Sequence, residues 1–549
     1  MRLAVFVALS LFMLAYRIFA FDGYYGWDDM AYAEYAAQLM NGQLSLTDTS
    51  HFVYRWGIIV PLAISYKLFG INDISTTLPP LLASIGTLYL LYRLTRHADI
   101  YLSIAAMLLF ALDYYTLCYA LRPYADVMIT FFSVLMLYPL LRQNGQVLGV
   151  GSAGCVAIGL LICWVTKETA LFFVPLLAFC FAYALYYRQN KRFWGYAILF
   201  SALLGIAYFA FLQYKTGTWS YRFDRIAANY YFNPCSYHLL PFSVLWHRIT
   251  TGLLELLVAT GMIIAMMWSL VTLVAQSDAL PIAQHINSPS PPLAHTPPNV
   301  QPPISRQLIF AVLFVVFYYM PVSYQHYIPM CLDGRHFLPL VPLGALAAAP
   351  AVAAFVRNGS YAFAIIGIAL VVALLAAIGW ANRPMTAIYI AIVLVCCLGY
   401  IGQKKQLPAY ITMSLLAAVL CLHPVYVMFR ATDTGYALQT AIVKQYLLQN
   451  TQRKLVVSDD LNENLGKYYT HFDPNAPVVF INYADYCPEM LQMGNFEQLY
   501  VLSNHYTNRN IMESGYTVPN YMLHLPPNCT AIADSGGIKL YRANATDLD

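Results

Sequence analysis

An acidic pair, Asp28 and Asp29, lies directly after the first membrane-length apolar run of the chain. Aspartate is among the costliest residues near lipid, so this pair is a poor membrane anchor. A carboxylate at a membrane surface can instead act as the base that takes a proton from a hydroxyl nucleophile. The simpler alternative is that one carboxylate caps a helix over 30–40 while the other faces water.

The other candidate residues lie in short polar segments between apolar runs. A guanidinium beside aromatic rings suits a lipid phosphate, which it can hold through two hydrogen bonds. Taken singly, each such charge is more often a loop residue or an interfacial anchor. If the segments share one membrane face, the side chains could line one water-accessible site. They are Tyr54 and Arg55 in 51–57, Arg122 and Asp126 in 120–126, Lys167 and Glu168 in 164–169, and His326, Asp333, Arg335 and His336 in 324–339.

Metal and nucleotide sites have little support in the sequence. Asp28, Asp29 and His326 could together hold a divalent metal cation, and no other cofactor is expected. The 11 cysteines lack the CxxC spacing of a zinc or redox site. The sequence also lacks a P-loop motif, so a transferred group is expected to come from a lipid donor and not from a nucleotide.

The composition is that of a membrane protein. Of the 549 residues, 60% are hydrophobic and only 10% are charged, whereas charged residues make up about 25% of soluble domains. The net charge of +4 is spread thinly along the chain, without a Lys/Arg-rich tract. We therefore expect membrane lipid around the chain and no nucleic acid partner.

The apolar runs predict an all-α polytopic membrane protein with about thirteen transmembrane helices, each of roughly 20 residues. The predicted spans are 2–21, 74–93, 100–119, 126–142, 147–165, 170–187, 194–213, 250–275, 307–321, 337–356, 360–380, 385–402 and 407–428. Lys and Arg gather in alternate loops, and such an excess marks the cytoplasmic side. The first loop (22–73) is therefore predicted to be extracytoplasmic, with interfacial helices over 30–40 and 56–70.

Two domains are predicted. The first, 1–429, is a transmembrane domain interrupted by a Pro-rich cytoplasmic linker over 277–306. The second, 430–549, is a small extracytoplasmic α/β domain in which short apolar runs alternate with Pro, Asn and Gly. Its strands are predicted at 454–459, 477–483, 498–504, 521–525 and 538–543, after a helix near 434–450.

Five short motifs follow one another along the chain: WDDMAYAEY (27–35), Lys-Leu-Phe-Gly (67–70), Tyr-Ala-Asp (124–126), Thr-Lys (166–167) and Arg-His-Phe-Leu-Pro (335–339). In this order and membrane placement they resemble motifs of the GT-C glycosyltransferases that use polyprenyl-phosphate sugars. The similar families are the protein O-mannosyltransferases and the lipid A aminoarabinose transferase. The resemblance covers about 20–215 and is weaker over 310–345.

The resemblance implies a role for each matching residue. Asp28 matches the family's catalytic base, and Asp29 matches its acidic neighbour. Arg55 takes the place of a phosphate-contacting Lys, although relatives usually have Lys-Pro or Arg-Pro there and this chain has Arg55-Trp56. The remaining residues are expected to bind the lipid phosphate or the sugar: Tyr54, Arg122, Asp126, Lys167, Arg335 and His336.

The function that the resemblance implies is transfer of a sugar, with inversion, from a polyprenyl-phosphate donor to a hydroxyl group. The acceptor would be a lipid, a glycan or a protein on the outer side of the cell (inner) membrane. An oligosaccharide ligase or polymerase of the GT-C type is an alternative. A lipid-linked glycan transporter or flippase is a second alternative, which predicts charges deep in the spans.

Overall fold

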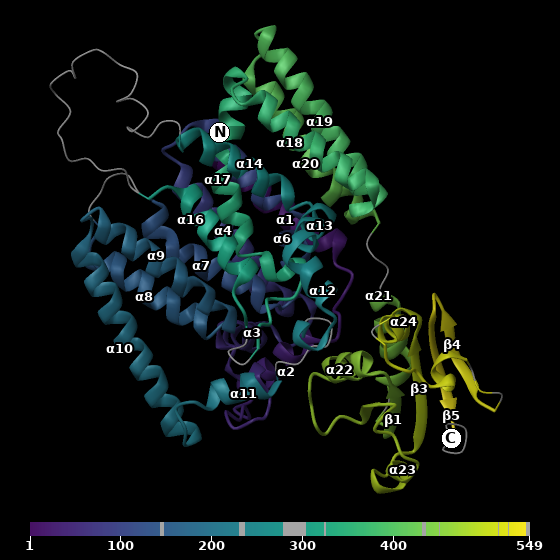
Figure 1. Cartoon of the computed structure of the whole chain (residues 1–549). Coiled ribbons are helices and arrows are strands. Elements are labelled where there is room, and N and C mark those ends of the chain that lie inside the picture. The colour runs from purple at the N-terminus through teal and green to yellow at the C-terminus, as the bar shows by residue number, and fades with distance from the viewer. Residues whose placement is uncertain are drawn as a thin grey trace, which may run out of the picture.

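Figure 1 shows the computed structural model of the chain, a helical body with a small sheet at one end. The structure describes residues 1–142, 148–229, 236–277, 304–322, 326–430, 435–449, 451–513, 515–524, 526 and 528–544. The N-terminus lies in the upper part of the helical body, and the strands lie at the lower right of the view (Figure 1). The predicted Pro-rich linker falls, over 278–303, outside the described residues.

In the described part of the chain, 9 helical stretches are long and apolar enough to cross a membrane. The single helices among them are α1 (Arg2–Ala20), α4 (Asp73–Thr95), α10 (Lys191–Thr216), α17 (Leu340–Asn358), α19 (Arg383–Lys404) and α20 (Ala409–Phe429). The composite stretches are η2 (Glu168–Phe172) with α9 (Phe173–Tyr186), α12 (Phe242–His247) with η5 (Arg248–Gly252) and α13 (Leu253–Thr260), and α18 (Ala362–Leu375) with η7 (Ala376–Trp380).

Shorter apolar helices complete the bundle: α5 (Ile100–Ala111), α7 (Ala125–Leu141), α8 (Val150–Trp164), α14 (Ile263–Ser277) and α16 (Arg306–Tyr319). The predicted all-α polytopic architecture is confirmed. The predicted span 100–119 is wrong as a single helix, since it is divided between α5 and α6 (Tyr114–Tyr119). The predicted span 250–275 is also wrong as a single helix. It is divided between α13 and α14, because Gly261 adopts a φ of +88° and ends α13.

The centre of the bundle is α17, which packs against α5, α14 and α16. Its middle is rich in alanine, and Ala345 to Ala349 are completely buried. Small side chains let neighbouring membrane helices approach closely, so the sequence explains why this helix is enclosed.

The first loop contains α2 (Asp28–Met40), η1 (His51–Tyr54) and α3 (Trp56–Phe69). Both helices predicted in this loop are present. At 1.5 Å per residue, the 14 residues of α3 are too few to cross a hydrocarbon core of about 30 Å. The loop ends at Asn72, whose side chain accepts the backbone N–H groups of Ile74 and Ser75 at 3.0 Å and caps α4.

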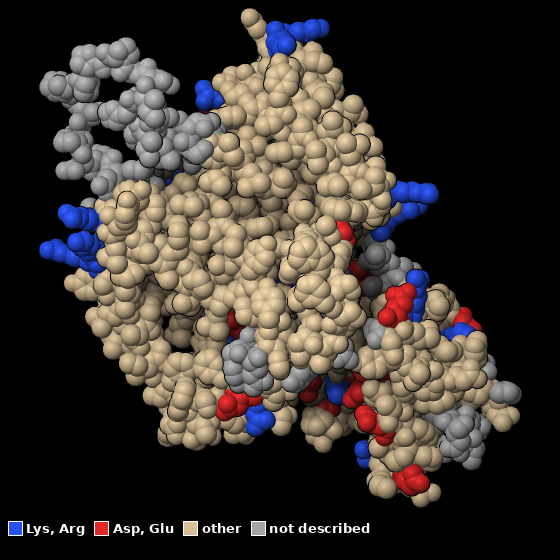
Figure 2. Space-filling model, in the orientation of Figure 1, with Lys and Arg blue, Asp and Glu red and all other residues tan. Residues whose placement is uncertain are grey.

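Charged side chains are distributed unequally between the two ends of the molecule. Lys191 and Arg192, at the start of α10, are exposed, as are Lys404 and Lys405, at the end of α19. In Figure 2, Lys and Arg at the top and upper left stand apart from any acidic residue, whereas Asp and Glu lie in the lower half and towards the C-terminal sheet, where further Lys and Arg lie among them. Basic residues at one end are typical of the cytoplasmic side of a membrane protein.

The C-terminal part forms a 5-stranded sheet of order β2-β1-β3-β5-β4. Its strands are β1 (Lys454–Ser458), β2 (Val478–Asn482), β3 (Gln498–Asn504), β4 (Thr530–Ser535) and β5 (Ile538–Ala543). The accompanying helices are α21 (Tyr436–Ile442), η8 (Val443–Leu447), α22 (Asp460–Tyr469), α23 (Glu489–Met493), α24 (His505–Glu513) and α25 (Asn520–Leu523).

The strand predicted at 521–525 is wrong, because residues 521–523 belong to the short helix α25. The missed strand is β4, an edge strand with largely exposed residues and thus without the apolar alternation that marks a half-buried strand. A tight turn joins it to β5 through Gly536 and Gly537, which have φ values of +56° and +79°. Paired glycines are a known signal of such a hairpin.

The sheet domain contacts the loop that precedes α2 and the first residue of α4. Tyr436 and Tyr468 donate to Asp73 Oδ1 at 2.8 and 3.2 Å, and their rings pack edge-on against Tyr24. Asn464 of α22 donates to the backbone oxygen of Gly26 at 2.9 Å. The C-terminal domain therefore supports the segment that leads into Asp28.

Candidate active site

Asp28 and Arg335 form an ion pair at the start of α2. Arg335 Nη1 donates to Asp28 Oδ2 at 3.2 Å, and the Asp28 side chain is 31% exposed. Arg335 belongs to η6 (Gly334–Phe337), which is capped by Asp333, and its guanidinium also lies 3.1 Å from Asp333 Oδ2. Asp28 is thus held beside a cation while part of its surface stays open to solvent.

The neighbouring Asp29 fixes the backbone that presents Asp28. Asp29 is completely buried, and both of its oxygens accept backbone N–H groups, that of Tyr25 at 2.7 Å. Burial raises the pKa of Asp29 to about 6. The observed contacts of Asp29 are therefore structural.

Gly26 lets the loop before α2 pass close to α22. It has a φ of +81°, and a Cβ there would lie 2.7 Å from the carbonyl oxygen of Leu461.

Asp126, Lys167 and His336 meet from three separate elements: the first turn of α7, the turn between α8 and η2, and η6. Lys167 Nζ lies 2.5 Å from Asp126 Oδ1 and 3.1 Å from His336 Nδ1. The Asp126 and Lys167 side chains are only 5% and 9% exposed. This arrangement places a largely buried ammonium group beside Arg335.

Arg55 pairs with Glu168. Arg55 Nη2 donates to Glu168 Oε2 at 2.9 Å, and Arg55 Nη1 donates to the Tyr32 hydroxyl. Gly57 lets α3 approach this region, because a Cβ there would lie 1.8 Å from Thr166 Oγ1. The start of α3 and the turn before η2 are thereby held together.

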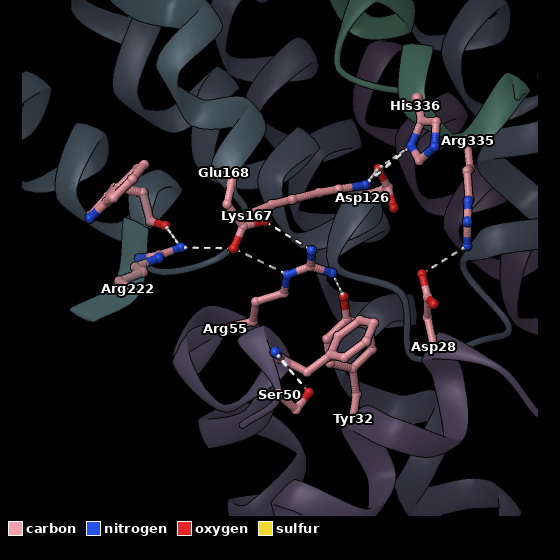
Figure 3. Close-up of polar contacts among 12 residues, drawn as sticks. Asp28, Tyr32, Ser50, Arg55, Asp126, Lys167, Glu168, Arg222, Arg335 and His336 are labelled. Carbon is pink, nitrogen blue, oxygen red and sulfur yellow. Dashed lines mark hydrogen bonds and ion pairs between the residues drawn. The ribbon is translucent and has the colours of Figure 1, made fainter. Parts of the chain in front are cut away.

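Figure 3 shows the polar side chains gathered in one region between α2, α7, η2 and η6. The ion pair of Asp28 lies on one side of this region, the contacts of Lys167 lie above its centre, and Arg55 lies at the centre. We call this group the polar cluster: Asp28, Arg55, Asp126, Lys167, Glu168, Arg335 and His336.

Other candidate residues contact different parts of the chain. Arg122 is buried, pairs with Asp22 and donates to the backbone oxygen of Gly23 at 3.0 Å, so it supports the loop before α2. Tyr54 is buried, and its hydroxyl donates to the backbone oxygen of Leu46. Through these contacts, both side chains stabilise the structure around the polar cluster.

The residues considered for a metal ion do not fit one. The oxygens of Asp29 are both used by backbone N–H groups, and Asp28 is paired with Arg335. His326 stacks on His238, with ring centres 4.4 Å apart. Across the described ranges, no three His, Cys, Asp or Glu side chains are grouped to hold a metal. These side chains therefore do not form a metal site.

Acidification should destabilise the protein through His336. The pKa of this imidazole is lowered from its usual value of about 6.5, first by burial and then by Lys167. A lowered folded-state pKa contributes stability above pH 6.5 that is lost as the pH falls towards the folded-state value. We expect His336→Asn to lose less stability than the wild type between pH 7.5 and 5, with a difference in slope of at most about 1.4 kcal/mol per unit of pH.

Thermal unfolding in detergent at several pH values tests this expectation. Asp29 titrates in the same range with the opposite sign, since its pKa is raised to about 6. Its contribution is common to both proteins and cancels in the difference. Parallel stability curves for the wild type and His336→Asn would contradict the prediction.

Two residues of the region were missed by the sequence analysis. Tyr32 lies four residues after Asp28 in α2, so it shares a helix face with the acidic residue, and this spacing could have revealed it. Arg222 lies in α11 (Tyr221–Asn229), where Nη2 contacts Glu168 Oε1 at 3.3 Å. No motif or spacing in the sequence distinguishes Arg222 from an ordinary loop arginine.

Comparison with known proteins gives a likeness in structure only. No family model and no curated protein matches the sequence. ArnT from Cupriavidus metallidurans in the apo state has a TM-score of 0.57 at 13% identity, and the match covers 99% of this chain and 98% of ArnT. ArnT bound to undecaprenyl phosphate has a TM-score of 0.55 at 13% identity, with 98% and 97% covered.

The oligosaccharyltransferase of Archaeoglobus fulgidus, tethered to an acceptor peptide, is a more distant match. Its TM-score is 0.41 at 12% identity, with 93% of this chain and 70% of that chain covered. The likeness to ArnT, the lipid A aminoarabinose transferase, extends over nearly the whole of both chains and concerns the fold. The chain is therefore a multi-pass membrane protein with the GT-C fold.

Proposed function

We propose that this chain is an integral membrane glycosyltransferase that moves one sugar from a polyprenyl-phosphate donor to a hydroxyl acceptor. The observation that carries the proposal is the position of Asp28, a partly exposed carboxylate paired with Arg335 in one cluster with Lys167 and Arg55. The likeness in fold to ArnT, which has been crystallised with undecaprenyl phosphate, supports a lipid phosphate as the leaving group.

In the proposed reaction, Asp28 takes the proton of the acceptor hydroxyl while that oxygen attacks the anomeric carbon of the sugar. The bond between this carbon and the phosphate oxygen breaks, and its electron pair leaves with the polyprenyl phosphate. Attack from the opposite face inverts the anomeric configuration. Cations held beside the developing negative charge lower the barrier, and Arg55, Lys167 and Arg335 are the residues in position to do so.

An apolar groove beside the polar cluster supports a long hydrocarbon donor. The groove has a volume of about 190 Å³ and is lined by α8, η2, α9, α10 and α11, with Trp164, Gly205 and Tyr208 among its residues. Arg222 donates to the Tyr208 hydroxyl and the Trp164 backbone oxygen, and also pairs with Glu168. Glu168 in turn pairs with Arg55, so Arg222 and Glu168 link the groove to the proposed phosphate-binding residue.

Filling the groove should weaken donor binding. Gly205→Phe places a large side chain where a Cβ meets no atom within 4 Å, so the fold should tolerate it. Burial of each CH₂ group of the donor chain contributes about 0.8 kcal/mol to binding. If two such groups can no longer enter the groove, the donor KM should rise about tenfold. Gly195→Phe on the same helix, also in open space and outside the groove, is the matched control. An unchanged KM in Gly205→Phe would exclude this groove.

We place the polar cluster and the C-terminal domain on the extracytoplasmic side of the cell (inner) membrane. Exposed basic residues gather at the opposite end of the molecule. Cys331, four positions before Arg335, forms a disulfide, and disulfides persist in oxidising compartments outside the cytoplasm. Both observations support the same orientation.

The function can be tested by comparing lipid-linked sugars and glycans from cells with and without the protein. Without it, one polyprenyl-phosphate sugar should accumulate, and one class of lipid, glycan or protein acceptor should lack a single sugar. Loss of a whole oligosaccharide would favour a ligase. Identical profiles in the two strains would contradict the proposal.

A further inference from the structure

Glu168 lies between two guanidinium groups, those of Arg55 and Arg222 (Figure 3). Its Oε2 is 2.9 Å from Arg55 Nη2, and its Oε1 is 3.5 Å from Arg55 Nε and 3.3 Å from Arg222 Nη2. The carboxylate therefore occupies both donors of the fork through which Arg55 would hold a phosphate. Glu168 and a phosphate on Arg55 would compete for the same nitrogen atoms.

The charges of the polar cluster are already balanced. Arg335 is paired with Asp28, Lys167 with Asp126, and Arg55 with Glu168. Adding a phosphate would place a further anion beside these carboxylates, and leaving a buried charge unpaired is costly. One carboxylate must therefore lose its cationic partner when a phosphate binds. Glu168, the carboxylate paired with Arg55, has an alternative partner.

Arg222 can receive the displaced carboxylate. It is completely buried, with its guanidinium 4.1 Å from the centre of the Trp164 ring. Its Nη1 and Nη2 donate to protein oxygens, but its Nε has no hydrogen-bond partner among the described residues. A small rotation of Glu168 from Arg55 towards Arg222 would satisfy this buried donor, whose present state is unfavourable.

We propose that Glu168 is a displaceable counter-ion, which holds Arg55 before the donor binds and moves onto Arg222 when a phosphate takes its place. The inference rests on the proposed function, because it takes Arg55 as a phosphate-binding residue. Glu168 and Arg222 are positioning residues in this scheme. Return of the carboxylate to Arg55 would help to expel polyprenyl phosphate after transfer.

Binding of undecaprenyl phosphate to the full-length protein in detergent tests the scheme, because the two positioning residues have opposite expected effects. Glu168→Gln removes the competing charge and should lower the Kd about tenfold. Arg222→Gln leaves the carboxylate on Arg55 and should raise the Kd about tenfold. In the double variant the loss of Arg222 should have no further effect, because no carboxylate remains to be moved.

The control is Glu255→Gln, which removes a partly exposed carboxylate paired with His247 at 3.3 Å in another part of the chain and should leave the Kd unchanged. Weaker or unchanged binding in a folded Glu168→Gln protein would overturn the inference. If that variant does not fold, Glu168→Asp keeps the charge but shortens its reach, and it too should bind more tightly than the wild type. Unchanged or weaker binding in Glu168→Asp would be equally decisive.

The same titration separates this inference from the function on which it rests. If the wild type does not bind undecaprenyl phosphate, the proposed function fails and the counter-ion scheme fails with it. If the wild type binds but neither Glu168 variant binds more tightly, only the counter-ion scheme fails.

Discussion

Replacing Asp28 with Asn should reduce sugar transfer about 10³-fold without weakening the binding of polyprenyl phosphate. The amide has the shape of the carboxylate and can still accept from Arg335, so the local structure should persist. It is too weak a base to take the proton of an attacking hydroxyl. The measurement is the initial rate of polyprenyl phosphate release by purified protein, together with the Kd for that lipid.

A suitable control for Asp28→Asn is Asp48→Asn. Asp48 belongs to the same loop but accepts from Tyr35 and from the backbone of Ser50, outside the polar cluster. The control should keep transfer within about twofold of the wild-type rate, a difference that corresponds to less than 1 kcal/mol. Full activity in Asp28→Asn would remove Asp28 from the mechanism.

Lys167→Met should lower the stability of the folded protein and abolish transfer. The substitution leaves Asp126, 2.5 Å away and almost fully buried, without its cation. Breaking a buried ion pair in this way costs about 3–5 kcal/mol. In Lys167→Met with Asp126→Leu, the buried charge is gone and most of the stability should return, whereas transfer should stay low because no ammonium group stabilises the leaving phosphate.

The comparison uses thermal unfolding in detergent and the transfer rate of each variant. Lys467→Met is the matched control, because Lys467 pairs with Glu463 at 2.8 Å but is 41% exposed, and such pairs contribute about 0.5 kcal/mol or less. If the double variant regained transfer along with stability, Lys167 would have a structural role only.

Much of the fold could be predicted because membrane helices are long and apolar. A helix such as α19 needs only its own hydropathy to be recognised, since all its backbone hydrogen bonds are internal. Elements that depend on tertiary contacts were harder. The strand β4 has little apolar pattern of its own and exists through its pairing with β5, whereas residues 521–523 have an apolar pattern but belong to α25.

The candidate site was predictable in part for a similar reason. Asp28, Lys167 and Arg335 stand out because charge is rare in this chain, and the structure brings them into one cluster. The sequence could not show that Asp29 is turned inward onto the backbone of Tyr25. Neighbouring residues in the first turn of a helix point in different directions, and only the packing of the preceding loop decides which carboxylate is exposed.

The support of α2 by the C-terminal domain is a further feature that no local pattern reveals. The contact of Asn464 with Gly26 joins residues more than four hundred positions apart. Such contacts depend on the completed fold, so they could not be inferred from one sequence.

The most direct test of the account is to give purified protein in lipid nanodiscs a series of polyprenyl-phosphate sugars with a cell-envelope extract as the source of acceptor. We expect release of polyprenyl phosphate from one of these donors, with transfer of its sugar in inverted configuration. This release should be lost in Asp28→Asn. Absence of release from every donor by folded wild-type protein, or equal release by Asp28→Asn, would contradict the assignment of the polar cluster as a glycosyl transfer site.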